Sequence, residues 1–438
     1  MSSRSTALMS GALAASLSIS VHAATEVQWW HAMGGELGEM LESVTEAFNA
    51  SQDDYRVRPS YRGNYTETMT GAIAAFRAGQ QPHILQVFEV GTGTMMAAEG
   101  AVYPIHQLME DHGRAFDREA FLPAVVGYYT DTRGNMLSFP FNSSTPILYY
   151  NRDAFAAAGL KGAPQTWEDV AAYSRQLHEQ GAARCGFTTS WPSWIMLENF
   201  SAMHDSPLGT LENGFGGLQT ELAFDNGLVA SHWDNLKAWQ DEGVFRWGGP
   251  GPGNDAAPMF YSGECAMFFG SSAARAGVLA NTDFSVGYGM LPYYADVEGA
   301  PQNSIIGGAT LWTLRGHSDE EYAAVAAFFD YLSQPEVQAD WHQRTGYLPI
   351  THAAWELSEA QGFYADNPGT EISIEQMTLN TPTENSKGLR FGNFVQIRDL
   401  ISEEMEAVMA GRKSGEQAAA DAVRRGNALL RDFEQANQ

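Results

Sequence analysis

Apolar residues follow two alternating patterns along most of the chain. Short runs that are apolar at most positions, such as 83–91 and 265–269, are typical of strands buried on both faces of a sheet. Other segments space their apolar residues three and four positions apart, and the stripe within 37–48 predicts an amphipathic helix. Because strand and helix patterns alternate, the sequence predicts an α/β fold with mainly parallel sheets covered by helices.

A further set of alternating elements follows Pro146, and Thr166 is expected to cap one of its helices. In sheets of this kind ligands bind beyond the carboxyl ends of the strands, so polar residues at strand ends are candidates for a binding site. The other predicted strands are 26–31, 55–61, 185–189 and 284–290, and the predicted helices include 67–77, 194–203, 228–241 and 320–345.

Residues 138–151, SFPFNSSTPILYYN, place a stretch of hydrogen-bonding side chains between two apolar runs. Such a stretch is either a simple turn or a crossing between two domains that offers its hydroxyl groups to a ligand. A second polar, glycine-containing stretch leads into an apolar strand within 299–315. The chain of 438 residues is also too long for one ordinary core, which favours two domains.

The first 23 residues have the composition of a cleaved secretory signal. One basic residue, Arg4, precedes a stretch of small and apolar residues, and small residues end the segment at Ala23. We therefore expect a mature chain that begins at Ala24 and works in an extracytoplasmic space, with a buried N-terminal helix as the alternative. The segment contains no cysteine, which argues against a lipid anchor.

Acidic residues outnumber basic ones by 52 to 25, and the formal net charge is −27. Such a charge argues against nucleic acids and anionic membranes as partners. It fits a salt-tolerant source and ordinary solubility equally well. The two cysteines, Cys185 and Cys265, form either a disulfide or two buried thiols, because sequence alone does not give their distance.

Motifs for catalysis, nucleotides and metals are missing from the sequence. It contains neither a G-x-x-x-x-G-K-[ST] phosphate loop nor a G-x-S-x-G nucleophile turn, and its histidines and cysteines lack zinc-site spacing. We therefore expect no enzymatic activity, no cofactor and no bound metal.

Polar and aromatic residues at the ends of predicted elements remain as candidates for a binding site. Each also has a structural interpretation as a turn, cap or core residue, so none is decisive alone. These residues are Tyr65, Glu89, Ser144, Trp191, Trp194, Ser271, Ser272, Gly307 and Gly308.

Several longer stretches resemble one transport family. They are WWHAMGGELG (29–38), GNYTETMTGAIAAFRAG (63–79), ILQVFEVGTGTMMA (84–97), PFNSSTPILYYN (140–151), WIMLENFSA (194–202), APQNSIIGGATLW (300–312), WHQRTGYLPIT (341–351) and GLRFGNFVQIR (388–398). Together they resemble the periplasmic glycerol-3-phosphate-binding proteins of ABC importers, over nearly the whole chain after the expected signal. The segment GYLPIT by itself marks only the wider family of extracellular solute-binding proteins.

The resemblance implies a type II periplasmic-binding-protein fold, in which crossing strands join two α/β lobes around a ligand cleft. It divides the chain into a first lobe of residues 24–141 and 300–350 and a second lobe of residues 142–299 and 351–438. The residues it implies for the ligand pocket are Tyr65, Glu89, Ser144, Trp191, Trp194, Ser271, Gly308, Tyr347 and Arg398, each of the type that the family pattern requires.

Within that pocket Arg398 is expected to donate two hydrogen bonds to a phosphate, and Glu89 to accept from glycerol hydroxyls. A periplasmic protein, monomeric when free, would then deliver glycerol 3-phosphate or a glycerophosphodiester such as glycerophosphocholine to the importer. Its partners would be two transmembrane permease subunits with a dimeric cytoplasmic ATPase. The Gly/Pro-rich stretch 246–258 departs from the family pattern and leaves the preference for larger diesters open.

Two other functions stay open. An oligosaccharide-binding protein of the same fold is the first, but Arg398 together with Ser271 argues against it, because sugar sites more often use carboxylates and aromatic rings. A secreted glycoside hydrolase is the second, and it would need two carboxylates in the pocket, where only Glu89 is expected.

Overall fold

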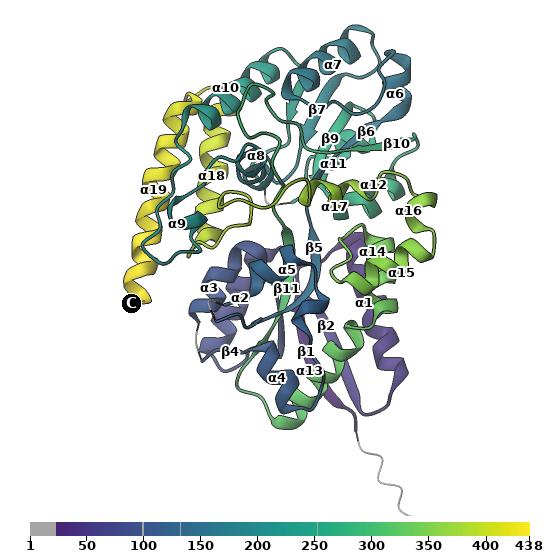
Figure 1. Cartoon of the computed structure of the whole chain (residues 1–438), viewed down its shortest axis with the longest axis vertical. Coiled ribbons are helices and arrows are strands. Elements are labelled where there is room, and N and C mark those ends of the chain that lie inside the picture. The colour runs from purple at the N-terminus through teal and green to yellow at the C-terminus, as the bar shows by residue number, and fades with distance from the viewer. Residues whose placement is uncertain (1–22, 99, 132, 252) are drawn as a thin grey trace, which may run out of the picture.

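The computed structural model describes residues 23–438 except 99, 132 and 252, so the expected signal lies outside the described residues apart from its last position. Two α/β lobes, each built around one sheet, lie one above the other in Figure 1, with the N-terminal part of the chain in the lower lobe. Among the helices of the described residues we find none with the length and hydropathy of a membrane span.

The sheet of the first lobe consists of β1 (Thr25–His31), β2 (Tyr55–Tyr61), β3 (Ile84–Phe88), β4 (Val102–Tyr103), β5 (Phe139–Ser144) and β11 (Gly307–Leu314). Its strand order is β2-β1-β3-β11-β4, and β5 also pairs with β11. β1 lies parallel to β2 and β3, whereas β11 is antiparallel to its three partners. Every residue of β3 is buried, which explains why all its residues except Gln86 are apolar.

The sheet of the second lobe consists of β6 (Pro146–Asn151), β7 (Cys185–Thr189), β8 (Phe245–Trp247), β9 (Cys265–Ser271) and β10 (Val286–Gly289). Its order is β10-β6-β9-β7-β8, with β7 parallel to β8 and β9, and with β6 antiparallel to β9 and β10. Phe88 and Ser271, which end β3 and β9, line one cavity, so the carboxyl ends of these two strands lie where the two lobes meet.

Helices cover both sheets, and the C-terminal α18 (Phe394–Met409) and α19 (Gly415–Ala436) pack on each other and on α10 (Gly227–Asp241), along one side of the upper lobe in Figure 1. The other α-helices are α1 (Gly35–Ser51), α2 (Tyr65–Arg77), α3 (Thr92–Ala97), α4 (Ile105–Asp111), α5 (Pro123–Tyr129), α6 (Arg152–Ala157), α7 (Trp167–Glu179), α8 (Phe200–Met203), α9 (Thr210–Asn213), α11 (Ala257–Tyr261), α12 (Arg275–Asn281), α13 (Asp319–Leu332), α14 (Pro335–Thr345), α15 (His352–Ala360), α16 (Phe363–Asp366) and α17 (Ile372–Met377). Short 3-10 helices are η1 (Glu89–Gly91), η2 (Arg118–Ala120) and η4 (Ser272–Ala274), and η3 (Trp194–Asn199) is a π-helix.

Two predicted elements begin or end differently in the structure. The helix expected over 320–345 is two helices, because Pro335 lacks an N–H group for a continuing helix and instead begins α14. Tyr65 does not end a strand; it is the first residue of α2, behind a capping box formed by Asn64 and Glu67. The prediction that Thr166 caps a helix is confirmed, since its side chain accepts from the Asp169 N–H.

The polar stretch between the two apolar runs is a crossing between the sheets. Ser144 ends β5 and pairs with Gly307 in the first sheet, whereas Pro146 begins β6 and pairs with Ser271 in the second. Thr145 lies between them, and its hydroxyl is 2.7 Å from that of Ser304, beside the second crossing. Because β5 carries the first sheet past residue 141, we propose Thr145 as the point where the lobes divide.

Cys185 and Cys265 form a disulfide between the neighbouring strands β7 and β9, where the register places them opposite each other. Sequence had left this bond open because it does not give the distance between two residues that are 80 positions apart. Disulfides persist in oxidising compartments, so the bond is consistent with an extracytoplasmic protein.

Removing this disulfide is expected to lower the free energy of unfolding by about 2–4 kcal/mol, because the bond limits the freedom of the unfolded chain. The Cys185→Ala, Cys265→Ala double variant should therefore unfold at lower denaturant concentration and still bind ligand with unchanged affinity. The wild-type protein in a reducing buffer is the matched comparison. Equal midpoints in oxidising and reducing buffers would contradict the prediction.

Candidate binding site

A cavity of about 230 Å³ opens between the facing edges of the two sheets. All the residues predicted for the pocket line it, and they come from both lobes. From the first lobe and the crossing come Tyr65, Glu89, Ser144, Gly308 and Tyr347, and from the second lobe Trp191, Trp194, Ser271 and Arg398. The structure thus brings together residues that lie as far apart in sequence as Glu89 and Arg398, which are 309 positions apart.

Arg398 on α18 is bound by two carboxylates. Its Nε and Nη2 donate to the Oε1 and Oε2 of Glu198 at 2.9 and 2.6 Å, and Nη2 also donates to Glu89 Oε1 at 2.7 Å. The Ser193 hydroxyl donates to Glu198 Oε1 at 2.9 Å. Arg398 and Glu89 are 5 % exposed and Glu198 only 1 %, so solvent screens these charges little.

These three side chains form a buried triad, which carries one net negative charge when both carboxylates are ionised. Burial raises the pKa of Glu89 above its ordinary value, the Arg398 guanidinium lowers it, and the Glu198 carboxylate raises it again. Burial alone would lower the pKa of Arg398, but the two carboxylates raise it, so the guanidinium remains charged. The Glu89–Arg398 pair also connects the two lobes, because Glu89 follows β3 and Arg398 lies on α18.

In the structure the Arg398 N–H groups expected to fork to a phosphate have another partner. The forked pair of N–H groups is directed at Glu198, and a phosphate at the same place would face the net negative charge of the triad. Glu198 was missed in the sequence because it is one of 52 acidic residues. Its position within the mostly apolar segment WIMLENF was the one signal of burial.

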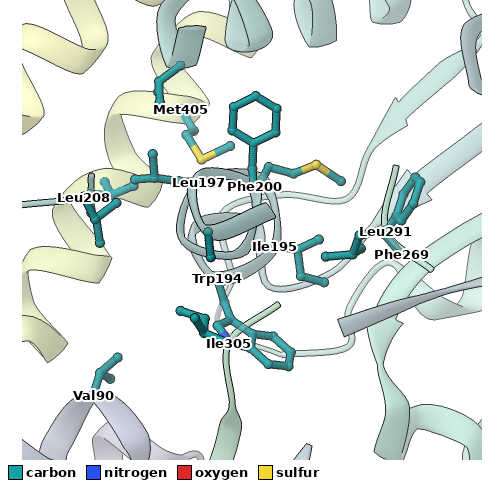
Figure 2. Close-up of a cluster of buried hydrophobic side chains, with 14 of the residues drawn as sticks. Val90, Trp194, Ile195, Leu197, Phe200, Leu208, Phe269, Leu291, Ile305 and Met405 are labelled. Atoms are coloured by element: carbon teal, nitrogen blue, oxygen red, sulfur yellow. The ribbon is translucent and has the colours of Figure 1, made fainter. Parts of the chain in front are cut away.

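Glu198 lies in the π-helix η3. In Figure 2 the apolar side chains of η3 point in different directions into the core: Trp194 lies toward Ile305, and Ile195 toward Leu291. All residues of η3 are buried. A π-turn inserts one extra residue into the helical repeat, which changes the direction in which side chains point, and such turns are frequent at functional sites.

The hydroxyl groups of Tyr65, Ser144, Ser271 and Tyr347 belong to a further part of the cavity lining, which we call the hydroxyl end. Ser271 ends β9, and its Oγ accepts from the Ala273 N–H at 3.2 Å, which leaves its own proton free for a ligand. Burial raises the pKa of the Tyr65 hydroxyl well above its ordinary value, and it raises the pKa of Tyr347 to about 12. With Ser144, these residues offer neutral donors, because both tyrosines stay protonated at physiological pH.

Two glycines allow the chain to pass close to this end of the cavity. Gly308 has φ of +94°, and a Cβ atom there would lie 1.9 Å from the carbonyl oxygen of Asn142. A Cβ atom on Gly307 would lie 2.2 Å from the Trp194 ring. Both positions therefore require glycine, the first for its backbone conformation and the second for contact with an aromatic wall.

The Gly/Pro-rich stretch reaches the rim of the cavity, which Gly253 and Asn254 help to line. Asn254 accepts a hydrogen bond from Trp191 Nε1 at 3.0 Å, so the loop fixes the plane of this indole. Trp191 itself has φ of +50°, an uncommon conformation for a bulky residue that is often found at functional sites.

A second cluster of polar side chains, His83, His317 and Glu321, lies away from the cavity at the amino end of β3. His83 Nδ1 accepts from the Gln28 N–H at 3.0 Å, so the ring proton is on Nε2, which lies 3.1 Å from Glu321 Oε1. With both ring nitrogens engaged, His83 has no lone pair for a metal ion, and we assign the cluster a structural role.

Comparison with known proteins identifies relatives over almost the full chain. The family model of bacterial extracellular solute-binding proteins matches residues 43–371. The sn-glycerol-3-phosphate-binding periplasmic protein UgpB of Yersinia pseudotuberculosis is 46% identical over 430 residues, which cover 98% of this chain and 97% of that protein. The protein of the same name from Pectobacterium atrosepticum is 46% identical over 425 residues, with 96% and 95% covered.

Solved structures share the fold at lower identity. UgpB from Mycobacterium tuberculosis in complex with glycerophosphocholine matches with a TM-score of 0.78 at 20% identity, covering 94% of this chain and 99% of that chain. A cyclic alpha-maltosyl-1,6-maltose binding protein from Arthrobacter globiformis matches with a TM-score of 0.70 at 21% identity, covering 93% and 100%. The expected two-lobed α/β fold of periplasmic binding proteins is thereby confirmed.

Proposed function

Because this chain belongs to the bacterial extracellular solute-binding proteins, we propose that it is the solute-binding subunit of an ABC importer that takes up sn-glycerol 3-phosphate or glycerophosphodiesters. Relatives that are 46% identical over nearly the whole chain are named for binding sn-glycerol 3-phosphate. The observation that carries the proposal is the cavity between the lobes, whose lining combines the charged groups of Glu89 and Arg398 with neutral hydroxyl donors. Like those relatives, the protein works in the periplasm.

The polarity of the cavity sets the orientation of the ligand. A phosphate carries only acceptor atoms at its oxygens, and we place it among the hydroxyls of Ser144, Ser271, Tyr65 and Tyr347 and the backbone of Gly308. Glycerol hydroxyls are donors as well as acceptors, and we place them at the Glu89–Arg398 end. In this orientation the phosphate lies away from the net negative charge of the triad. The orientation expected from sequence placed the phosphate at Arg398, which is part of the triad.

A glycerophosphodiester carries a further group on the phosphate, which would extend toward the rim of the cavity. Trp191 lies at this rim with its ring held by Asn254. An aromatic face attracts a quaternary ammonium group, so glycerophosphocholine would bind with its choline against Trp191. This contact favours diesters among the candidate ligands.

The remaining partners follow from the class of protein. We propose that the two lobes close around the ligand and that the closed protein, a monomer, docks on two membrane permease subunits served by a dimeric ATPase. Uptake of this kind needs no chemical step by the binding protein. The hydrolase alternative needs two carboxylates in the cavity, and of the described residues that line it only Glu89 is acidic.

Calorimetric titration of residues 24–438, stripped of bound ligand by unfolding and refolding, tests the proposal. Glycerol 3-phosphate and glycerophosphocholine should each give a Kd on the order of micromolar, the affinity that a few charged hydrogen bonds plus aromatic packing can supply. Maltose should give no heat of binding. Binding of maltose alone would overturn the proposal and leave the oligosaccharide alternative.

A further inference from the structure

A chain of buried amides connects the backbone of the first lobe to the hydroxyl end of the cavity. The Ala32 N–H donates to Gln86 Oε1 at 2.8 Å, and Gln86 Nε2 donates to Asn142 Oδ1 at 2.9 Å. Asn142 Nδ2 then donates to the Tyr65 hydroxyl oxygen at 3.0 Å. Gln86 and Asn142 are fully buried, on β3 and β5, so solvent does not compete for the bond between them.

The direction of every bond in this chain is fixed from its beginning. A backbone N–H is always a donor, so the group of Gln86 that faces Ala32 is its oxygen. The NH₂ group of Gln86 therefore faces Asn142, which turns the Asn142 oxygen toward Gln86 and its NH₂ group toward Tyr65. The Tyr65 oxygen thus accepts from Asn142, and its own O–H proton is left to donate into the cavity.

Packing of the Tyr65 ring keeps its hydroxyl group at the cavity. The Tyr65 ring is stacked on Phe88, with ring centroids 5.1 Å apart and an angle of 6° between the planes. Its hydroxyl lines the cavity beside Tyr347. When Tyr65 donates to Tyr347 in the empty site, the Tyr347 proton is the one directed at the ligand. In both arrangements a tyrosine O–H group is presented to the ligand as a donor.

We propose that Gln86 and Asn142 are specificity-determining positioning residues that make the tyrosine end of the cavity a donor and so select a ligand group that only accepts, such as a phosphate. The inference rests on the proposed function and identifies residues behind the cavity that determine its preference. Neither residue contacts the ligand; both act through the orientation of the Tyr65 O–H bond.

A double-mutant cycle between Asn142 and Tyr65 tests the proposal. In Asn142→Asp the carboxylate still accepts from Gln86 but can only accept from Tyr65, so the tyrosine proton turns away from the ligand. Asn142→Asp should raise the Kd for glycerol 3-phosphate in both backgrounds. The factor should be at least about tenfold larger in the wild-type background than in Tyr65→Phe, as expected for one hydrogen bond to a charged acceptor. The added charge affects both backgrounds and cancels.

Equal losses in the two backgrounds would overturn the proposal. The matched variant Asn142→Leu removes the contact without offering an acceptor to Tyr65, and it should weaken binding less than Asn142→Asp. If Asn142→Asp does not fold, Gln86→Glu takes its place in the double-mutant cycle with Tyr65→Phe. A carboxylate at position 86 can only accept from Asn142, so the Asn142 oxygen turns toward Tyr65 and accepts its proton. Failure of the wild-type protein to bind glycerol 3-phosphate would instead refute the proposed function, so the two failures are distinguishable.

Discussion

Replacing Arg398 by methionine is expected to lower the free energy of unfolding by about 3–5 kcal/mol, because it leaves two buried carboxylates without their cation. It should also weaken binding of glycerol 3-phosphate by about a hundredfold, since the charged donor at the glycerol end is lost. Denaturant unfolding and calorimetric titration of the same preparation measure the two effects.

Two control variants separate charge from general damage. Arg133→Met removes an arginine that pairs with Asp131 at the surface, where the Arg133 side chain is 82% exposed, and it should change stability by less than about 0.5 kcal/mol. The triple variant Glu89→Gln, Glu198→Gln, Arg398→Met removes all three charges and should recover much of the stability without recovering binding. Unchanged stability of Arg398→Met would contradict the buried triad.

Replacing Gly308 by alanine is expected to lower the free energy of unfolding by about 3 kcal/mol or more and to abolish binding. The residue has φ of +94°, and its Cβ atom would lie 1.9 Å from the Asn142 carbonyl oxygen, so β5 and β11 would have to separate at the crossing. The same movement would displace Asn142 and, through it, the Tyr65 hydroxyl. Thermal unfolding and titration measure both results.

Gly71→Ala is the matched control for this substitution. Gly71 lies inside α2, and a Cβ atom there would meet nothing within 4 Å. Alanine favours a helix over glycine, so this variant should be more stable than wild type by about 0.5–1 kcal/mol. A Gly308→Ala protein as stable as Gly71→Ala would show that the crossing tolerates a side chain.

Local patterns in the sequence were sufficient to predict most of the helices and strands. The strand over 185–189 and the helix that Thr166 caps were predicted because burial and capping leave local signatures. The break between α13 and α14 was missed because the apolar pattern continues across Pro335. The disulfide stayed open because the register of β7 against β9 is a property of the sheet, which no local pattern shows.

Most members of the pocket already stood out at the ends of predicted elements, and the resemblance added Tyr347 and Arg398. The contacts that decide their chemistry came only from the structure. Arg398 looked like a phosphate ligand as long as its partners were unknown, and the position of Glu198 changes that interpretation. Asn142 was expected in a turn or a crossing between domains, whereas its role depends on which of its amide atoms faces Tyr65. Both depend on side-chain contacts between distant parts of the chain, which periodicity and composition do not encode.

The central claim is that a phosphate ester binds between the lobes with its phosphate at the hydroxyl end and its glycerol at the triad. A crystal structure of the complex with glycerol 3-phosphate tests it most directly. We predict phosphate oxygens within hydrogen-bond distance of Ser144, Ser271 and Tyr65, and glycerol hydroxyls at Glu89 and Arg398. A phosphate bound directly to the Arg398 guanidinium, with the ion pair to Glu198 broken, would contradict the account.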